Sequence, residues 1–239
     1  VIESLKHWML DYHINGFRFD LMGLHETETM KAIYEALYAI DKNVMVYGEP
    51  WAGGSSPVVK GIDKTVIDQC WTTLTQNGVA CFNDSYRNAI KGGEFGGFQQ
   101  GQVQGTFNPT AIANGLKGSP EFTDLSDRSL NYVECHDNYT LFDKLDISIN
   151  GGNSKADYVA YDDMDSAYQN AIRAQNKLAA AYVFLAQGTP FINGGQEFMR
   201  TKQGDENSYV SSDEINGIDL SFKTKFADVY CVYKGLIAL

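Results

Sequence analysis

The 239-residue sequence has few basic residues and no run of them. Its 19 lysines and arginines stand against 30 aspartates and glutamates, which gives a formal net charge of −11. Nucleic acids and anionic lipid surfaces are bound mainly through positive charge, so this balance argues against a nucleic-acid or membrane partner. Long hydrophobic runs are also missing, because the longest apolar stretch, Leu178 to Ala186, is too short to span a bilayer.

Two kinds of cofactor motif are absent as well. The sequence has four cysteines and no CxxC pair, so zinc binding and thioredoxin-like chemistry are not indicated. We expect isolated core thiols, which slightly favours the cytoplasm over an oxidising compartment, and two disulfides are the alternative. No GxGxxG or GxxxxGK loop follows a predicted strand, so nucleotide binding lacks its usual signal. The four cysteines of the sequence are Cys70, Cys81, Cys135 and Cys231.

Hydrophobic periodicity predicts helices and strands that alternate along the chain. Helices are expected over 1–13, 26–40, 85–91 and 167–186 and from 225 onward, and strands over 16–20, 44–47, 79–82, 130–135 and 191–193. This order is typical of an α/β fold with a parallel sheet. A closed (β/α)₈ barrel needs eight strands, whereas an open doubly wound sheet, the alternative architecture, needs only five or six.

Acidic residues follow three of the predicted strands. Asp20 ends the first strand, Glu49 follows the second, and His136 and Asp137 follow the fourth. The carboxyl ends of parallel strands share one edge of a sheet or barrel, and that edge is where such folds place their chemistry. The sequence therefore predicts a group of carboxylates at this edge.

The strand 16–20 carries an arginine and an aspartate on one face. Side chains alternate along a strand, so Arg18 and Asp20 point to the same side and Phe17 and Phe19 to the other. We expect Arg18 to lower the pKa of Asp20 and keep it ionised. An ionised carboxylate fixed at a strand end is what a glycoside hydrolase uses as nucleophile, and the alternative is a structural salt bridge.

Glu49 is the candidate proton donor. It follows an apolar strand and precedes Trp51, and an apolar setting raises the pKa of a carboxyl group, as a general acid requires. His136 and Asp137 could hold sugar hydroxyls near the developing positive charge. The alternatives are a plain loop carboxylate for Glu49 and a core histidine for His136. Trp51, Tyr139 and Phe142 could line the sugar site, and the alternative is that they are core aromatics. We expect Gln196 and Glu197 to make structural hydrogen bonds and the acidic loop 162–165 to be solvated, with calcium binding as its alternative.

Three segments make the interpretation specific. GFRFDLMGLH, VYGEPWAGG and YVECHDNYTLFDKL resemble signature segments of the α-amylase glycoside hydrolase superfamily. Their detail resembles type I pullulanases, the bacterial starch-debranching enzymes. CFNDSYRNAIKGGEFGGFQQG, LAQGTPFINGGQEFMRTKQGDENSY and SSDEING support the narrower match, which runs over essentially the whole chain.

The resemblance implies roles at matching positions and a reaction. It makes Asp20 the nucleophile, Glu49 the general acid/base and Asp137 the third carboxylate, and it implies hydrolysis of α-1,6-glucosidic linkages in pullulan, amylopectin or related α-glucans. Retention of configuration requires the carboxyl groups of Asp20 and Glu49 about 5 Å apart. No cofactor is required, and calcium is allowed but not assigned to any residue. The resemblance also implies that the residues binding substrate include Arg18, His136 and Trp51.

Departures from the family pattern predict an incomplete catalytic domain. The earlier signature segment with an aspartate and a histidine, expected on a third barrel strand, has no match here. We therefore expect residues 1–239 to form one partial domain, strands 4–8 of a TIM-type (β/α)₈ barrel, truncated at both ends. Such a piece would need the missing half of the barrel to fold and would be inactive alone. The functional alternatives are an isoamylase, an α-amylase or a non-catalytic glucan-binding subunit.

Overall fold

The structure, a computed structural model, describes residues 1–51, 75–93, 98–149 and 151–239. Contacts divide the chain into two compact units. The first unit comprises Val1–Asn83, Lys117–Leu130 and Gln187–Thr189, and the second comprises Asp84–Leu116, Asn131–Ala186 and Pro190–Leu239.

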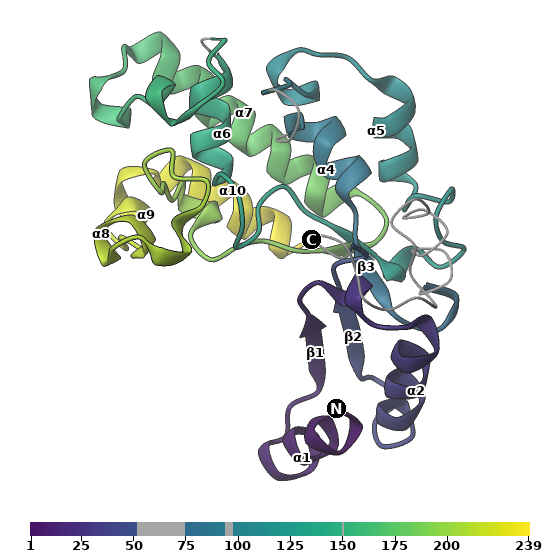
Figure 1. The fold of residues 1–239 in the computed structure, drawn as a ribbon. Coiled ribbons are helices and arrows are strands. Elements are labelled where there is room, and N and C mark those ends of the chain that lie inside the picture. The colour runs from purple at the N-terminus through teal and green to yellow at the C-terminus, as the bar shows by residue number, and fades with distance from the viewer. Residues whose placement is uncertain (52–74, 94–97, 150) are drawn as a thin grey trace. The chain divides into compact units, whose positions relative to one another are not determined.

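The first unit is built on the parallel sheet. Its strands run in the order β1-β2-β3-β4-β5, and β4 and β5 each extend by one residue into the second unit. The helices α1 and α2 accompany β1 and β2 (Figure 1). The bounds are α1 Ile2–Tyr12, β1 Gly16–Phe19, α2 Thr27–Tyr38, β2 Met45–Gly48, β3 Ala80–Phe82, β4 Ser129–Asn131 and β5 Thr189–Pro190, with 3₁₀ turns at Met22–Leu24 and Ser126–Arg128.

The apolar face of α2 forms much of the core of the first unit. The predicted stripe is confirmed at Met30, Ile33 and Leu37, which are fully buried against Val46 of β2. Ile40, the last predicted member, is exposed, because α2 ends at Tyr38 and the chain turns away before that position. The helix therefore fixes β2, the strand that leads to Glu49.

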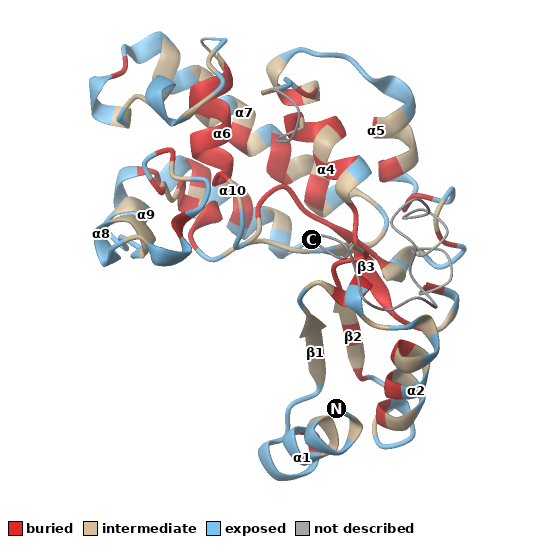
Figure 2. Cartoon of the chain, viewed as in Figure 1, coloured by how far each residue is buried: buried red, intermediate tan, exposed pale blue. Residues whose placement is uncertain are grey.

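The second unit is mainly helical. Its core gathers side chains from α4, α6, α7 and α10, and α6 is buried at eight of its nine positions (Figure 2). The bounds are α4 Asp84–Lys91, α5 Pro109–Leu116, α6 Leu141–Ile149, α7 Ser166–Leu185, α8 Asp213–Asn216, α9 Phe222–Lys225 and α10 Ala227–Ile237. Further 3₁₀ turns lie at Gln102–Gln104, Lys155–Asp157, Tyr161–Asp163, Gln196–Phe198 and Ser208–Val210.

The last two predicted strands are misplaced. The fourth, expected over 130–135, is β4 and ends at Asn131, and the fifth, expected over 191–193, is β5 and lies two residues earlier. Beyond Asn131 the segment is held by hydrogen bonds of its buried polar side chains and not by the backbone hydrogen bonds of a strand. Glu134, for example, accepts from Leu141 N of helix α6. A buried segment held in this way looks like a strand in the sequence without being one.

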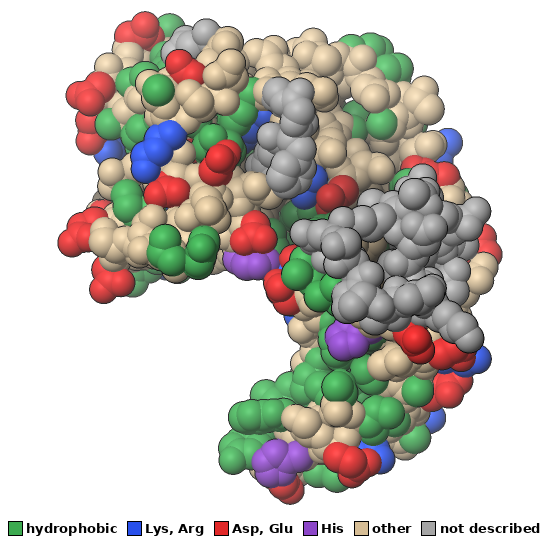
Figure 3. All heavy atoms as spheres, viewed as in Figure 1, with side chains coloured by type: hydrophobic (Ala, Val, Ile, Leu, Met, Phe, Trp, Pro, Cys, Tyr) green, Lys and Arg blue, Asp and Glu red, His purple; other side chains and the backbone are tan. Residues whose placement is uncertain are grey.

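Among the described residues on the face in Figure 3, basic side chains form no continuous patch. No described helix is both long and apolar enough to cross a membrane. Cys81 is buried as expected of a core thiol, but Cys231 is exposed on α10, so that expectation is wrong there. Cys70 lies outside the described residues.

Candidate active site

The pairing of β1 with β2 brings two carboxylates together. The strands are parallel, and their register aligns Phe19 with Gly48, so Asp20 and Glu49 are the next residues on each strand. The Glu49 backbone N–H donates to Phe19 O at 3.1 Å, which continues the ladder to the strand ends. One carboxylate oxygen of Asp20 lies within 4.8 Å of one of Glu49.

One arginine contacts both carboxylates. Arg18 Nη1 donates to Asp20 Oδ1, and Arg18 Nη2 donates to Glu49 Oε1. The planar guanidinium is suited to this because its donors point in two fixed directions. The predicted pairing of Arg18 with Asp20 is confirmed, and its second bond to Glu49 was not foreseen.

The two carboxylates differ in exposure. The Asp20 side chain is 59% exposed, whereas that of Glu49 is 6% exposed. Asp20 can therefore meet a ligand from solvent, and Glu49 is sheltered. The apolar setting expected for Glu49 needs correction, since its carboxylate contacts Arg18 and also accepts from Leu21 N at 2.6 Å.

The turn after β1 ties the two strand ends together. Leu21 has a left-handed backbone with φ 43°, which costs free energy for a residue with a side chain and persists only where the surroundings enforce it. Here the turn aims Leu21 N at Glu49 and lets Gly23 N donate to Trp51 O at 3.0 Å. Trp51, half-buried, is thereby held next to the Glu49 strand end.

His136 and Asp137 belong to the second unit. Both are exposed, and His136 Nε2 lies 3.6 Å from Asp137 Oδ1. The prediction that they directly end a strand is wrong, because β4 stops at Asn131 and they lie in the loop before α6. The alternative of a core histidine is also wrong for His136, since its side chain is 49% exposed.

Sequence reasoning missed the buried polar residues around that loop. Glu134 is buried, and burial raises its pKa to about 7. Asp143 and Lys202 are also buried, and Lys202 N donates to Asp143 Oδ2. The available signal was the run VECHDNYTLFDK, in which the charged residues Glu134 and Asp143 stand close to apolar ones. Tyr139 and Phe142 are buried, which favours the alternative that they are core aromatics. The structural hydrogen bonds expected of Gln196 and Glu197 are present, because Gln196 Nε2 donates to Tyr233 Oη and Glu197 accepts from Gly195 N.

The chain is similar over its whole length to known proteins. A pullulanase of Bacillus subtilis is 32% identical over 249 residues, which cover 100% of this chain and 32% of the relative. The solved pullulanase of Bacillus acidopullulyticus matches with a TM-score of 0.85 and 36% identity, covering 99% of this chain and 27% of that one. The pullulanase of Paenibacillus barengoltzii, solved with maltohexaose and alpha-cyclodextrin, matches with a TM-score of 0.83 and 36% identity over 99% and 35%. No family model matches.

The matches cover nearly all of this chain but only part of each relative. The chain spans about a third of the length of the Bacillus subtilis relative. Its fold is that of the corresponding part of the solved structures, and the parallel sheet fits the predicted half of a (β/α)₈ barrel.

Proposed function

We propose that this chain is part of the catalytic domain of a pullulanase-type debranching enzyme, a retaining glycoside hydrolase that cleaves α-1,6-glucosidic linkages in α-glucans such as pullulan and amylopectin. The full-length similarity to pullulanases supports the substrate class. The relative solved with maltohexaose and alpha-cyclodextrin supports binding of α-glucan chains by this fold.

The observation that carries the proposal is the pair of carboxylates joined by Arg18. Retaining enzymes hold their two carboxyl groups about 5 Å apart, while inverting enzymes hold them roughly 6.5–9.5 Å apart to admit a water molecule. The approach of Asp20 to Glu49 within 4.8 Å supports the retaining mechanism. The exposure of Asp20 supports its role as the group that meets the sugar.

The reaction proceeds in two displacements. Protonated Glu49 gives its proton to the glycosidic oxygen while the carboxylate of Asp20 attacks the anomeric carbon, so that the C–O bond to the leaving chain breaks and a glycosyl ester forms. Glu49 then removes a proton from water, the water oxygen attacks the same carbon, and Asp20 leaves as a carboxylate. Arg18 holds both carboxylates in place during each step.

Asp137, His136 and Trp51 complete the proposed machinery. The HDN motif supports Asp137 as the carboxylate that stabilises the positive charge on the sugar ring, with His136 binding a neighbouring hydroxyl. Trp51, held beside Glu49 by its contact with the β1 turn, offers an aromatic face to an apolar side of the sugar. A glucan-binding subunit without catalysis has no need of Asp20, Glu49 and Asp137 together.

Pullulan hydrolysis tests the proposal. The full-length protein should convert pullulan mainly to maltotriose, because cleavage of every α-1,6 bond of that polymer leaves this trisaccharide. Chromatography of the released oligosaccharides measures the share of maltotriose among the products. Absence of α-1,6 cleavage, with release of linear fragments from amylose instead, would favour an α-amylase activity and contradict the proposal.

A further inference from the structure

One buried carboxylate closes the loop that carries His136 and Asp137. Glu134 immediately precedes the loop, and its Oε2 accepts at 2.8 Å from Leu141 N, the first residue of α6. The two ends of the loop 135–140 are thus joined through a single side chain. Glu134 Oε1 accepts at 3.0 Å from Asn193 Nδ2, which attaches this closure to the segment after β5.

A buried lysine reaches the same loop from another segment. Lys202 is only 3% exposed, and its Nζ lies 3.4 Å from the carbonyl oxygen of His136. The backbone of Lys202 is fixed in turn, because its N–H donates to Asp143 Oδ2 at 2.8 Å. The neighbouring Thr201 Oγ1 donates to Asp143 Oδ1 at 2.5 Å.

These charges explain how the lysine can be buried. A buried cation is costly unless opposite charges and hydrogen bonds compensate it. Burial lowers the pKa of Lys202, and the carboxylates of Glu134 and Asp143 oppose that effect. Both carboxylates are fully buried, and each also has a backbone partner.

The charged residues that contact the ends and backbone of the loop 135–140 differ in burial from the residues at its tip. Glu134, Asp143 and Lys202 are buried, whereas His136 and Asp137 in the loop 135–140 are exposed. The core would be packed more simply by apolar side chains, since a buried ion pair seldom adds net stability. A polar network of this kind instead fixes one geometry for the groups that it holds.

We infer that Glu134, Asp143 and Lys202 are positioning residues that hold the segment His136–Asp137 in its reactive geometry. The inference rests on the proposed function only for the consequence in turnover. The structural claim, that Lys202 restrains the loop 135–140, concerns the second unit alone and can be measured without substrate.

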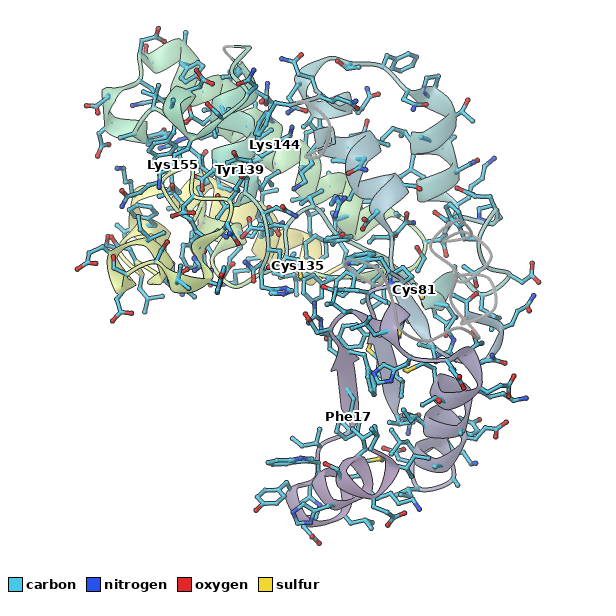
Figure 4. All side chains as sticks on the ribbon, viewed as in Figure 1. Phe17, Cys81, Cys135, Tyr139, Lys144 and Lys155 are labelled. Atoms are coloured by element: carbon cyan, nitrogen blue, oxygen red, sulfur yellow. The ribbon has the colours of Figure 1, made fainter. Side chains whose placement is uncertain are left out.

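Lys202→Met in the full-length protein is the primary test, with Lys155→Met as the matched control. Methionine keeps most of the length of the side chain and removes the donor to His136 O. Lys155 lies in the same unit but is exposed and pairs with Asp205 at 3.3 Å, and it is labelled in Figure 4 together with Cys135 at the start of the loop. Hydrogen exchange of the amides 135–140 should be about tenfold faster in Lys202→Met and unchanged in Lys155→Met. Equal exchange in wild type and Lys202→Met would overturn the inference.

Kinetics on pullulan give the second readout. For Lys202→Met we expect kcat to fall about tenfold or more while KM stays within about threefold, because the loss concerns groups that act in the transition state. A rise in KM alone would contradict positioning for catalysis. If the wild type cleaves no α-1,6 bonds, the proposed function fails while the exchange measurement still decides the restraint. Should Lys202→Met not fold, Thr201→Val removes a donor to Asp143 without exposing a charge, and the same faster exchange is expected; its absence would contradict the inference.

Discussion

At the scale of single residues, Arg18 explains how two carboxylates can lie so close together. Two like charges within 4.8 Å repel, and the side chain of Glu49 has little access to water that could screen it. A guanidinium that donates to both offsets the repulsion and fixes their separation. The sequence pattern of alternating side chains was sufficient to predict the bond to Asp20. The bond to Glu49 depends on the register of two strands 31 residues apart in sequence, which no local pattern encodes.

Glu134 gives a residue-scale prediction about pH. Burial raises its pKa from the ordinary 4.5 to about 7, so folding favours the protonated carboxyl group. Its stabilising contribution is complete below pH 4.5 and is lost as the pH rises through about 7, and a pKa difference of this size corresponds to about 3 kcal/mol. The Gln side chain of Glu134→Gln cannot ionise. From pH 4 to pH 8 the free energy of unfolding of the wild type should therefore fall by about 3 kcal/mol relative to that of the variant.

Denaturant unfolding of the full-length protein at both pH values measures this difference. Glu121→Gln is the matched control, since Glu121 is exposed, and it should follow the wild type at both pH values. An identical pH dependence for wild type and Glu134→Gln would show that the buried carboxyl group does not titrate in this range.

At the scale of elements, the sequence predicts those whose periodicity is strong. Helices α2 and α7 and strands β1 to β3 lie within a few residues of their expected places, because amphipathic stripes and apolar runs specify them locally. The amphipathic helix α5 and the buried helix α6 were not predicted. Nearly every position of α6 is buried, charged residues included, so it has no polar face for a periodic pattern to reveal.

The boundary of β4 fails for a related reason. The apolar residues that follow Asn131 satisfy the pattern of a strand, while the buried side chains of Tyr132 and Glu134 take their partners from α4 and α6. The tertiary partners therefore override the local propensity. The consequence for the site is that His136 and Asp137 lie on a loop held by side chains and not at the end of a strand.

Gly48 is the element-scale prediction. A Cβ atom at this position would lie 2.4 Å from Phe19 O, so β1 and β2 can pair closely only with glycine here. Gly48→Ala should force the strand ends apart, lower kcat on pullulan at least tenfold and destabilise the protein by about 1–3 kcal/mol. Gly235→Ala is the control, because a Cβ atom there meets nothing within 4 Å and alanine favours the helix α10. Wild-type activity in Gly48→Ala would mean that the separation of the strand ends is not critical.

At the scale of the whole molecule, the chain presents five strands of a fold that uses eight in its closed form. In the described sheet β1 and β5 are the end strands, and each leaves one edge available for pairing. The chain spans about a third of the length of the Bacillus subtilis pullulanase that it matches. Tests of catalysis therefore belong to the full-length protein.

The most direct test of the proposed mechanism is the replacement Asp20→Asn in the full-length protein, assayed for pullulan hydrolysis and for glucan binding. Asparagine keeps the shape of the side chain and can accept from Arg18, but it cannot form the glycosyl ester. We predict that turnover is abolished, that glucan binding persists, and that the control Asp127→Asn, at an exposed aspartate of the first unit, behaves as wild type. Retention of substantial hydrolysis by Asp20→Asn would contradict the assignment of Asp20 as the nucleophile, and with it the proposed mechanism.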